Sequence, residues 1–216
     1  QATEQVDLYE LTRQECQHYP EATLLAEPVS LLAQPKLLTH LVRNLLNNAM
    51  IHGVPPIEVY LYYAQTLGDA AIIPSALIEQ RQALDVSGDI LCNDIREVQS
   101  AEAGGRLPAE FLKRFARKDK DKDKAKSQPN FAVLAFIDQG QGIPEDKRED
   151  IFSPFVRLKQ EKKGSGLGLS LVSQIVEAHQ GKISTDTWQG HTRFLVVLPL
   201  KPKSMTSETD KAKLSS

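Results

Sequence analysis

The feature that most constrains the fold of this chain is an uninterrupted apolar run from Phe131 to Ile137, which Asp138 follows directly. Seven apolar residues without alternation are typical of a strand buried on both faces of a sheet. Asp138, Gly140 and Gly142 then predict a turn in which the backbone can approach a flat ligand closely. The same pattern also fits an ordinary turn between a strand and a helix.

A second feature is a strongly amphipathic helix predicted over residues 36–52. Asn44 and Asn48 lie four residues apart on its polar face, so both amide oxygens could reach one ligand or metal ion. Asn47 lies beside them, and three residues of a poor helix-forming type in one helix favour a functional role over simple solvation. The apolar face consists of Leu37, Leu38, Leu41, Val42, Leu45, Leu46 and Ala49.

A third feature is the segment 164–169, which places three glycines on alternate positions directly before a predicted helix over 168–180. Unpaired N–H groups at such a helix start favour a phosphate or another anion. The segment lacks the Gly-Lys-Ser/Thr ending of a Walker loop, and a loop precedes it where a dinucleotide-binding fingerprint would have a strand. The hinge of a flexible lid would use the same glycines.

The remaining predicted elements are less distinctive. They are a helix over 7–19, short strands around 24–25 and 29–32, a strand over 57–63, a short helix over 144–152, a helix cap at Gly181, and strands over 183–187 and 192–198 joined by a turn at Gly190. Residues 64–130 have weak periodicity, and Lys alternates with Asp over 118–124, which predicts an insertion. We expect one domain over residues 1–200 with this insertion at 64–130, and a flexible polar tail over 201–216.

Composition narrows the classes of function. A net charge of -2 gives no basic field that would attract nucleic acid or anionic lipid, and the chain has no apolar run of the ~18 residues that a membrane span needs. Cys16 and Cys92 lie outside any zinc or disulfide spacing. We therefore expect no nucleic-acid partner and a soluble fragment of a longer protein, because the chain starts at Gln1 without a leader.

The order of these features resembles the GHKL family of ATP-binding domains, and within it the catalytic domain of sensor histidine kinases. The resemblance runs from about Leu37 to Leu198 without the insertion. Residues 44–49 resemble the N box, 138–143 the first glycine box, 151–155 the F box and 164–169 the second glycine box. It implies an α+β fold, a two-layer α/β sandwich of the Bergerat type, with helices on one face of a mixed, mostly antiparallel sheet and an ATP lid.

The resemblance also implies roles for particular residues. Asn48 and Asn44 would hold Mg²⁺ and the phosphates, Asp138 would bind the adenine amine, and Phe155 would anchor the lid. Apart from the resemblance, proximity in sequence suggests the hypothesis that Arg157, Lys162 or Lys163 of the lid meets the phosphate charge in place of the basic residue that Ile51 replaces. The implied ATP-binding residues are Asn44, Asn48, His52, Asp138, Gly140, Gly142, Ile143, Phe155, Arg157, Gly164, Gly166, Leu167, Gly168 and Leu169.

The branch of the family depends on one position. Relatives that hydrolyse ATP place a Glu one turn before the second N-box residue to activate water, and this chain has Asn44 there. This favours a kinase that holds Mg-ATP for phosphoryl transfer over an ATPase. An inactive nucleotide-binding module stays open, because Ile51 stands where many histidine kinases have Lys or Arg, and so does a serine-directed kinase of the anti-sigma type.

The resemblance implies partners as well. None of His18, His40, His52, His179 and His191 lies in the His-Glu/Asp-x-x-x-Pro setting of a phosphoacceptor, so none is expected to be catalytic. We expect the acceptor His on a helical dimerisation domain that precedes Gln1, and a response regulator as the second partner. The parent protein would be a homodimer anchored in the inner membrane with its kinase part on the cytoplasmic side, and this fragment would be monomeric.

Overall fold

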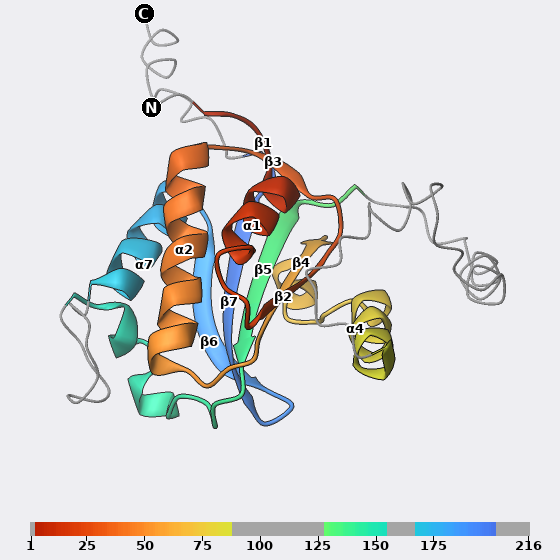
Figure 1. Cartoon of the computed structure of the whole chain (residues 1–216). Helices are drawn as coiled ribbons and strands as arrows, with labels where there is room; N and C mark the ends of the chain where they lie inside the picture. The colour runs from red at the N-terminus through yellow and green to blue at the C-terminus, as the bar shows by residue number, and fades with distance from the viewer. Residues whose placement is uncertain (1–2, 88–127, 155–166, 202–216) are drawn as a thin grey trace, which may run out of the picture.

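The computed structural model describes residues 3–87, 128–154 and 167–201 (Figure 1). The elements in these ranges are, in chain order, β1 (Glu4–Asp7), α1 (Leu8–Cys16), β2 (Ala22–Ala26), β3 (Ser30–Ala33), α2 (Pro35–His52), β4 (Ile57–Ala64), α3 (Leu67–Ala70), α4 (Ser75–Ser87), β5 (Phe131–Asp138), the 3₁₀ turns η1 (Glu145–Lys147) and η2 (Asp150–Phe152), α7 (Gly168–Ala178), β6 (Lys182–Trp188) and β7 (His191–Pro199). Among the described helices, none is both long and apolar enough to cross a membrane.

The main sheet has five strands in the order β2-β4-β5-β7-β6, and β1 and β3 form a separate antiparallel pair. Within the main sheet, β2 runs parallel to β4, and the other neighbouring strands are antiparallel. The α+β class and the mixed, mostly antiparallel sheet predicted from the sequence are confirmed.

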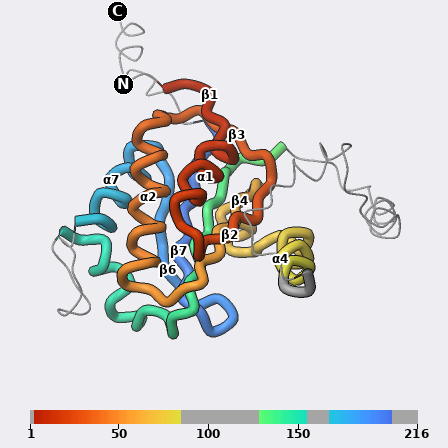
Figure 2. Tube along the Cα trace, viewed as in Figure 1, coloured from red at the N-terminus to blue at the C-terminus, as the bar shows by residue number. Residues whose placement is uncertain are grey.

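One face of this sheet, here called the front face, is covered by three helices. Figure 2 shows α2 between α7 and α1, and α2 packs against both of them. The predicted apolar stripe of α2 points into the core, where Leu38, Leu41 and Leu46 have no exposed surface. Each leucine buried to this degree contributes about 1.5–3 kcal/mol relative to full exposure.

The opposite face, here called the back face, carries Tyr60, Tyr62 and Ile137. It is covered in part by Leu77 of α4 and by Ile73 in the segment that joins α3 to α4. β5 is therefore buried on both sides, as its apolar run predicted. The first part of the predicted insertion is a folded layer, which the weak periodicity of the sequence did not indicate. The prediction of helices on one face describes α1, α2 and α7, and the back layer is added to it.

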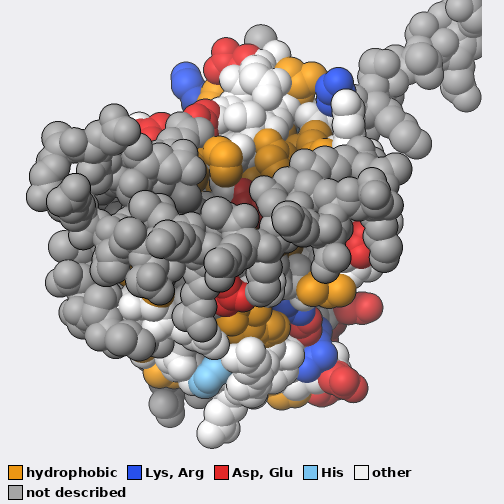
Figure 3. All heavy atoms as spheres, turned by 90° about the vertical axis from the view of Figure 1, so that its right-hand side faces the viewer, with side chains coloured by type: hydrophobic (Ala, Val, Ile, Leu, Met, Phe, Trp, Pro, Cys, Tyr) orange, Lys and Arg blue, Asp and Glu red, His pale blue; other side chains and the backbone are white. Residues whose placement is uncertain are grey.

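The side of the molecule on which α4 lies in Figure 1 faces the viewer in Figure 3. Among the described side chains visible there, positive and negative groups are interspersed. This distribution agrees with the small net charge of the chain, -2.

Two local predictions need correction. The segment predicted as a short helix over 144–152 forms the two 3₁₀ turns η1 and η2. Within η2, Ile151 is buried and the ring of Phe152 packs edge-on against that of Phe194, with the ring centroids 6.3 Å apart. The chain also begins with β1, which precedes the helix expected from residue 7. Its single apolar residue, Val6, gives no strand signal.

The end of α7 also differs from the prediction of a glycine cap. The left-handed residue is Gln180, with φ 58°, and the N–H of Gly181 donates to the carbonyl of Val176 at 2.9 Å. A Cβ on Gly181 would lie 2.5 Å from the carbonyl oxygen of Val197. Glycine is thus required at position 181 because the backbone there lies close to β7, and the left-handed conformation is adopted by the preceding residue, Gln180.

This arrangement predicts opposite effects of two adjacent substitutions. Gln180→Gly should raise the free energy of unfolding by up to about 1 kcal/mol, because glycine adopts the left-handed region without steric cost. Gly181→Ala should lower it by about 1–3 kcal/mol, because the new methyl group meets the β7 backbone. Urea unfolding of both variants measures the two changes, and equal effects would contradict the assignment.

Candidate functional site

The carboxylate of Asp138 joins two segments that are far apart in the sequence. It lies at the end of β5 with 3% of its surface exposed. Its Oδ1 accepts hydrogen bonds from the backbone N–H of Gly140 at 2.7 Å and of Val54 at 3.2 Å. The N–H of Gln139 donates in return to the carbonyl of Val54 at 2.7 Å. The turn after β5 is thereby fixed to the residues that follow α2.

Side chains are excluded from the two glycine positions next to this carboxylate. A Cβ on Gly53 would lie 2.5 Å from the carbonyl oxygen of Ala49 and 2.6 Å from Cγ of Asp138. A Cβ on Gly140 would lie 2.6 Å from Oδ1 of Asp138. The backbone at these two positions therefore lies so close to the carboxylate that only glycine fits.

Two threonines support the glycine turn, and the sequence analysis missed both. Asp138, Thr192 and Thr187 are paired neighbours across β5, β7 and β6. The hydroxyl of Thr192 accepts from the N–H of Gly142 at 3.0 Å, and a Cβ on Gly142, where φ is 90°, would lie 2.6 Å from Oγ1 of Thr187.

A sequence signal existed for only part of this arrangement. The predicted turn at Gly190 is a two-residue hairpin turn with positive φ at Gln189 and Gly190, which is enough to pair Thr187 with Thr192. The pairing of Thr192 with Asp138 depends on the register of β5 against β7. Local sequence carries no signal for that register.

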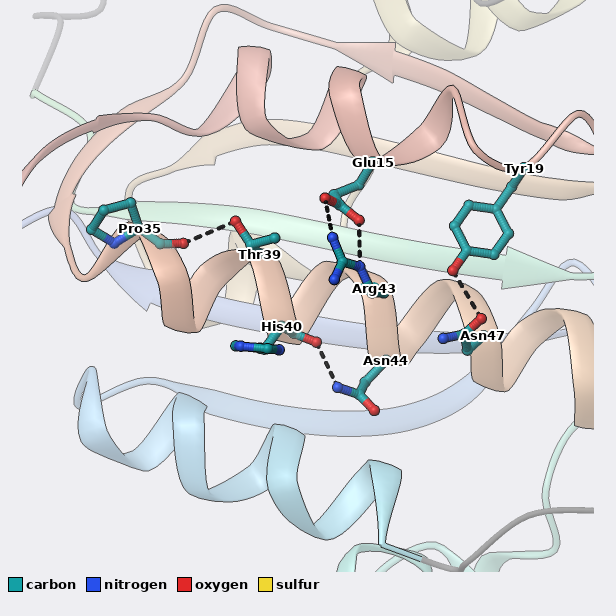
Figure 4. Close-up of polar contacts among 8 residues, drawn as sticks. All are labelled: Glu15, Tyr19, Pro35, Thr39, His40, Arg43, Asn44 and Asn47. Carbon is teal, nitrogen blue, oxygen red and sulfur yellow. Dashed lines mark hydrogen bonds and ion pairs between the residues drawn. The ribbon is translucent and has the colours of Figure 1, made fainter.

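The asparagines of α2 divide between its two flanks. Figure 4 shows Asn44 and His40 on the side of α2 that faces α7. Nδ2 of Asn44 donates to the carbonyl of His40 at 2.7 Å, and Oδ1 lies 3.4 Å from the position a Cβ would take on Gly168. Asn48 lies one turn further along, partly buried, and His52 is exposed at the last position of the helix.

The other flank of α2 is held by α1 and the residues after it. The carboxylate of Glu15 accepts two hydrogen bonds from Arg43 at 2.9 Å, and the hydroxyl of Tyr19 donates to Asn47 at 2.8 Å (Figure 4). The hydrogen-bonded Glu15 carboxylate raises the pKa of Arg43, and burial together with the Glu15 charge raises the pKa of Tyr19. Asn47, counted above as a sign of function, is thus used for packing.

The start of α7 meets α2 at Asn44. Leu167 is the N-cap residue and Gly168 the first helical residue, and Leu167 makes no side-chain cap hydrogen bond. The first N–H groups of a helix have no partner within it, so this terminus favours an anion. Asn44 is the polar side chain that the described structure brings next to Gly168.

The other predicted residues divide into two groups, those that pack in the described structure and those that lie outside it. Ile143 and Leu169 pack against the front-face core, and the carbonyl of Ile143 accepts from Arg148 at 2.9 Å. Among the described residues, no group of three His, Cys, Asp or Glu side chains could hold a metal ion. Phe155, Arg157, Lys162, Lys163, Gly164 and Gly166 lie outside the described residues, as do Cys92 and nearly all of the predicted tail.

Comparison with known proteins gives a consistent picture. Residues 103–202 match the family described as histidine kinase-, DNA gyrase B- and HSP90-like ATPase, a range that contains both glycine boxes. A sensory histidine kinase/phosphatase, NtrB of Rhodobacter capsulatus, is 46% identical over 69 residues, which are 32% of this chain and 19% of that protein. The adaptive-response sensory kinase SasA of Rippkaea orientalis is 34% identical over 117 residues, which are 53% of this chain and 26% of that protein.

Solved structures agree at the level of the fold. The mycobacterial sensor histidine kinase MprB has a TM-score of 0.55 and 21% identity, covering 93% of this chain and 99% of that one. The catalytic domain of the histidine kinase ThkA has a TM-score of 0.55 and 18% identity, covering 94% of this chain and 98% of that one. The chain thus matches whole solved domains but spans only about a fifth of NtrB, 19% of its length.

The packing around Asp138 predicts the effect of filling the space at Gly53. Gly53→Ala should lower the free energy of unfolding by about 1–3 kcal/mol, because the methyl group meets both Asp138 and the end of α2. It should also speed amide hydrogen exchange at Gly140, whose N–H donates to the displaced carboxylate.

The matched control is Gly68→Ala in α3, where the nearest heavy atom to the new Cβ would lie at 3.7 Å. This variant should leave Gly140 exchange unchanged and raise stability by at most about 1 kcal/mol. Slow Gly140 exchange in the Gly53 variant would show that Asp138 does not depend on this contact.

Proposed function

Because residues 103–202 match the histidine kinase-, DNA gyrase B- and HSP90-like ATPase family and sensory histidine kinases are among the similar proteins, we propose that the chain is the ATP-binding catalytic domain of a two-component sensor histidine kinase, which holds Mg-ATP for phosphoryl transfer to a His on a separate dimerisation helix. The observation that carries the proposal is the contact of Asn44 with the start of α7, where Asn44 Oδ1 lies 3.4 Å from the Cβ position of Gly168. It places Asn44 of α2 next to Gly168, the first residue of α7.

The site residues fit an extended nucleotide. Asn44 and Gly53 are nine residues apart, which is about 13 Å along a helix at 1.5 Å per residue. The anion-favouring start of α7 lies at one end of this distance and the buried Asp138 carboxylate at the other. A nucleotide has its phosphates and its base separated in the same way.

The base end of the proposed site is the turn around Asp138. A carboxylate accepts hydrogen bonds, so it suits the exocyclic amine of adenine and disfavours the carbonyl that guanine has at that position. At the crowded positions 53 and 140, no side chain separates the backbone from the carboxylate. We assign adenine recognition to Asp138.

The phosphate end is assigned to Asn44, Asn48 and the start of α7. Amide oxygens are suitable ligands for Mg²⁺, which is bound by oxygen and carries the phosphate charge when ATP is present. The helix terminus of α7 adds N–H groups and a partial positive charge. Arg157 and the lysines that follow it are kept as proposed phosphate contacts from the sequence.

The chain favours transfer of the phosphoryl group over hydrolysis of ATP. Activation of water needs a general base, and α2 contains no Asp or Glu in its 18 residues. The amide of Asn44, at the position of the hydrolytic Glu, donates to the carbonyl of His40 and has no basic group to offer. The residues of α2 can bind and orient, and none of them is a carboxylate that could take a proton from water as the hydrolytic Glu does.

The partners follow from the relatives. NtrB and SasA are named as sensory kinases, which supports a phosphoacceptor dimerisation domain of the same protein and a response regulator as partners. For the longer protein we propose a homodimer anchored in the inner membrane, with this domain on the cytoplasmic side.

Nucleotide titration with a matched pair of asparagine variants tests the phosphate end. Calorimetry with a non-hydrolysable ATP analogue should give saturable binding that strengthens with Mg²⁺. Asn48→Ala should weaken binding in Mg²⁺ about 10- to 100-fold, the value of a hydrogen bond or ligand to a charged group. Asn47→Ala removes a neighbour that faces α1, so it should cost about 1 kcal/mol of stability and leave affinity within about twofold.

Absence of binding at millimolar nucleotide would overturn the proposal in favour of an inactive interaction module. Ile51, which is 46% exposed next to the N box, would then be the first residue to restore to a basic one. Equal losses in the Asn47 and Asn48 variants would mean that α2 has been destabilised as a whole.

Substitution of Asp138 tests the base end. Asp138→Asn keeps an oxygen for the N–H groups of Gly140 and Val54 but replaces the other acceptor with a donor. Affinity for the ATP analogue should fall about 10- to 100-fold. The ratio of GTP-analogue to ATP-analogue affinity should rise, and an unchanged ratio would exclude Asp138 from base recognition.

A further inference from the structure

A row of paired residues crosses the back face directly behind the proposed base-binding turn. Glu58 of β4 pairs with Ile137 of β5, Ile137 pairs with Arg193 of β7, and Arg193 pairs with Asp186 of β6. A second row of paired residues lies next to this one, and its side chains point to the front face. In β5, β7 and β6 the residues of this second row are Asp138, Thr192 and Thr187. Successive residues of a strand point to opposite faces, so the two rows share backbone but not side-chain surroundings.

Arg193 anchors the back layer to this row. Arg193 is 4% exposed, and its guanidinium donates to both carboxylate oxygens of Asp186, at 2.7 and 2.5 Å. Its third nitrogen donates to the carbonyl of Ala71, the C-cap residue of α3, at 2.7 Å. One buried cation thus joins β6, β7 and the layer formed by α3 and α4.

A second anchor lies at the other end of the row. Glu58, which is 8% exposed, accepts from Arg81 of α4 at 2.5 Å and from the hydroxyl of Tyr60 at 2.8 Å. Tyr62 of the same strand donates to the carbonyl of Ala70 at 2.5 Å, and burial raises the pKa of Tyr62. The back layer is therefore attached by directed polar contacts on both sides of Ile137.

We propose that Arg193 is a positioning residue for the nucleotide site, and that α3 and α4 tune nucleotide binding from the back face through it. This inference rests on the proposed function. Arg193 and Thr192 are consecutive in β7, so displacement of the Arg193 backbone displaces the hydroxyl that holds the N–H of Gly142. Asp186 and Thr187 have the same relation in β6.

The chemistry of the row favours a positioning role over a purely structural one. The ion pair is buried at Arg193, whereas 39% of the Asp186 side chain is exposed. Such a pair is often no more stabilising than apolar residues of the same volume, and the rest of the back-face cluster is apolar. What an ion pair adds is direction, because the planar guanidinium donates its hydrogen bonds in a fixed geometry. That geometry sets β6, β7 and α3 relative to one another at the turn.

Coupling of this kind is reciprocal. If the back layer favours the geometry that binds nucleotide, bound nucleotide must favour the attached back layer by the same factor. Amide exchange in α4 should therefore slow when a non-hydrolysable ATP analogue is added.

The test uses the full chain and four variants. Arg193→Gln removes the charge, Arg193→Lys keeps a donor for Asp186, and Arg81→Gln releases the second anchor. Arg13→Gln, the control, removes a partly exposed ion pair with Glu10 on α1. Each is measured for affinity toward the ATP analogue, for amide exchange at Gly140 and Gly142 without nucleotide, and for its thermal midpoint.

Arg193→Gln should bind the analogue about tenfold more weakly, a typical coupling between sites. It should also exchange the Gly140 and Gly142 amides faster. Arg193→Lys should recover part of both effects, Arg81→Gln should show them to a smaller degree, and Arg13→Gln should match the unaltered chain. If Arg193→Gln does not fold, Arg81→Gln decides, because Arg81 lies at a more open position with 26% of its side chain exposed.

A lowered thermal midpoint with unchanged affinity and unchanged glycine exchange would reduce Arg193 to a structural residue and overturn the inference. Failure of the unaltered chain to bind nucleotide would instead remove the proposed function. The exchange measurements need no nucleotide, so they still report whether Arg193 positions the turn.

Discussion

The arrangement of the site depends on one buried carboxylate. An ionised Asp at the end of a central strand is costly unless donors surround it, and Asp138 receives N–H groups from its own turn and from the segment after α2. Those donors can approach only because positions 53 and 140 carry no side chain. The hydrogen bonds that the Asp138 carboxylate needs therefore fix the end of α2, the glycine turn and the end of β5 relative to one another.

Helix α2 resolves a second constraint by dividing its polar residues between two neighbours. The flank toward α1 uses Arg43 and Asn47 in contacts with Glu15 and Tyr19, which oppose rotation of the helix about its axis. The flank toward α7 presents Asn44 at the start of that helix. His179, at the far end of α7, accepts a hydrogen bond at Nε2 from the N–H of Gln34, the N-cap residue of α2. Its Nδ1 lies 2.7 Å from the carbonyl oxygen of Ile175. The two helices are therefore also joined at the end that lies away from the site. Orientation of the N box is thus a property of packing on both sides.

What the sequence could predict was local. The period of apolar residues gave α2 almost to the residue, and the apolar run gave β5, because both patterns are imposed by one element on itself. Thr192 and Gly53 were missed because their partners lie in other strands or helices, and no local pattern encodes register. The back layer was missed because α4 is only weakly amphipathic, so its attachment relies on Arg81 and on the carbonyl contacts of α3. The roles of the asparagines facing α7 still rest on the resemblance to the family, whereas the role of Asn47 came from its contact with Tyr19.

The two-sided burial of β5 also decides how the inserted segment should be regarded. A sheet with helices on the front face alone would leave Tyr60, Tyr62 and Ile137 to solvent, and their strands have the composition of a core. The described start of the insertion, up to α4, covers these side chains and gives the buried Arg193 a carbonyl partner. The segment connects β4 to its antiparallel neighbour β5 in the chain, and its described part completes the domain as a structural layer on the back face. Any signal that acts on this layer would reach the glycine turn across the thickness of one sheet.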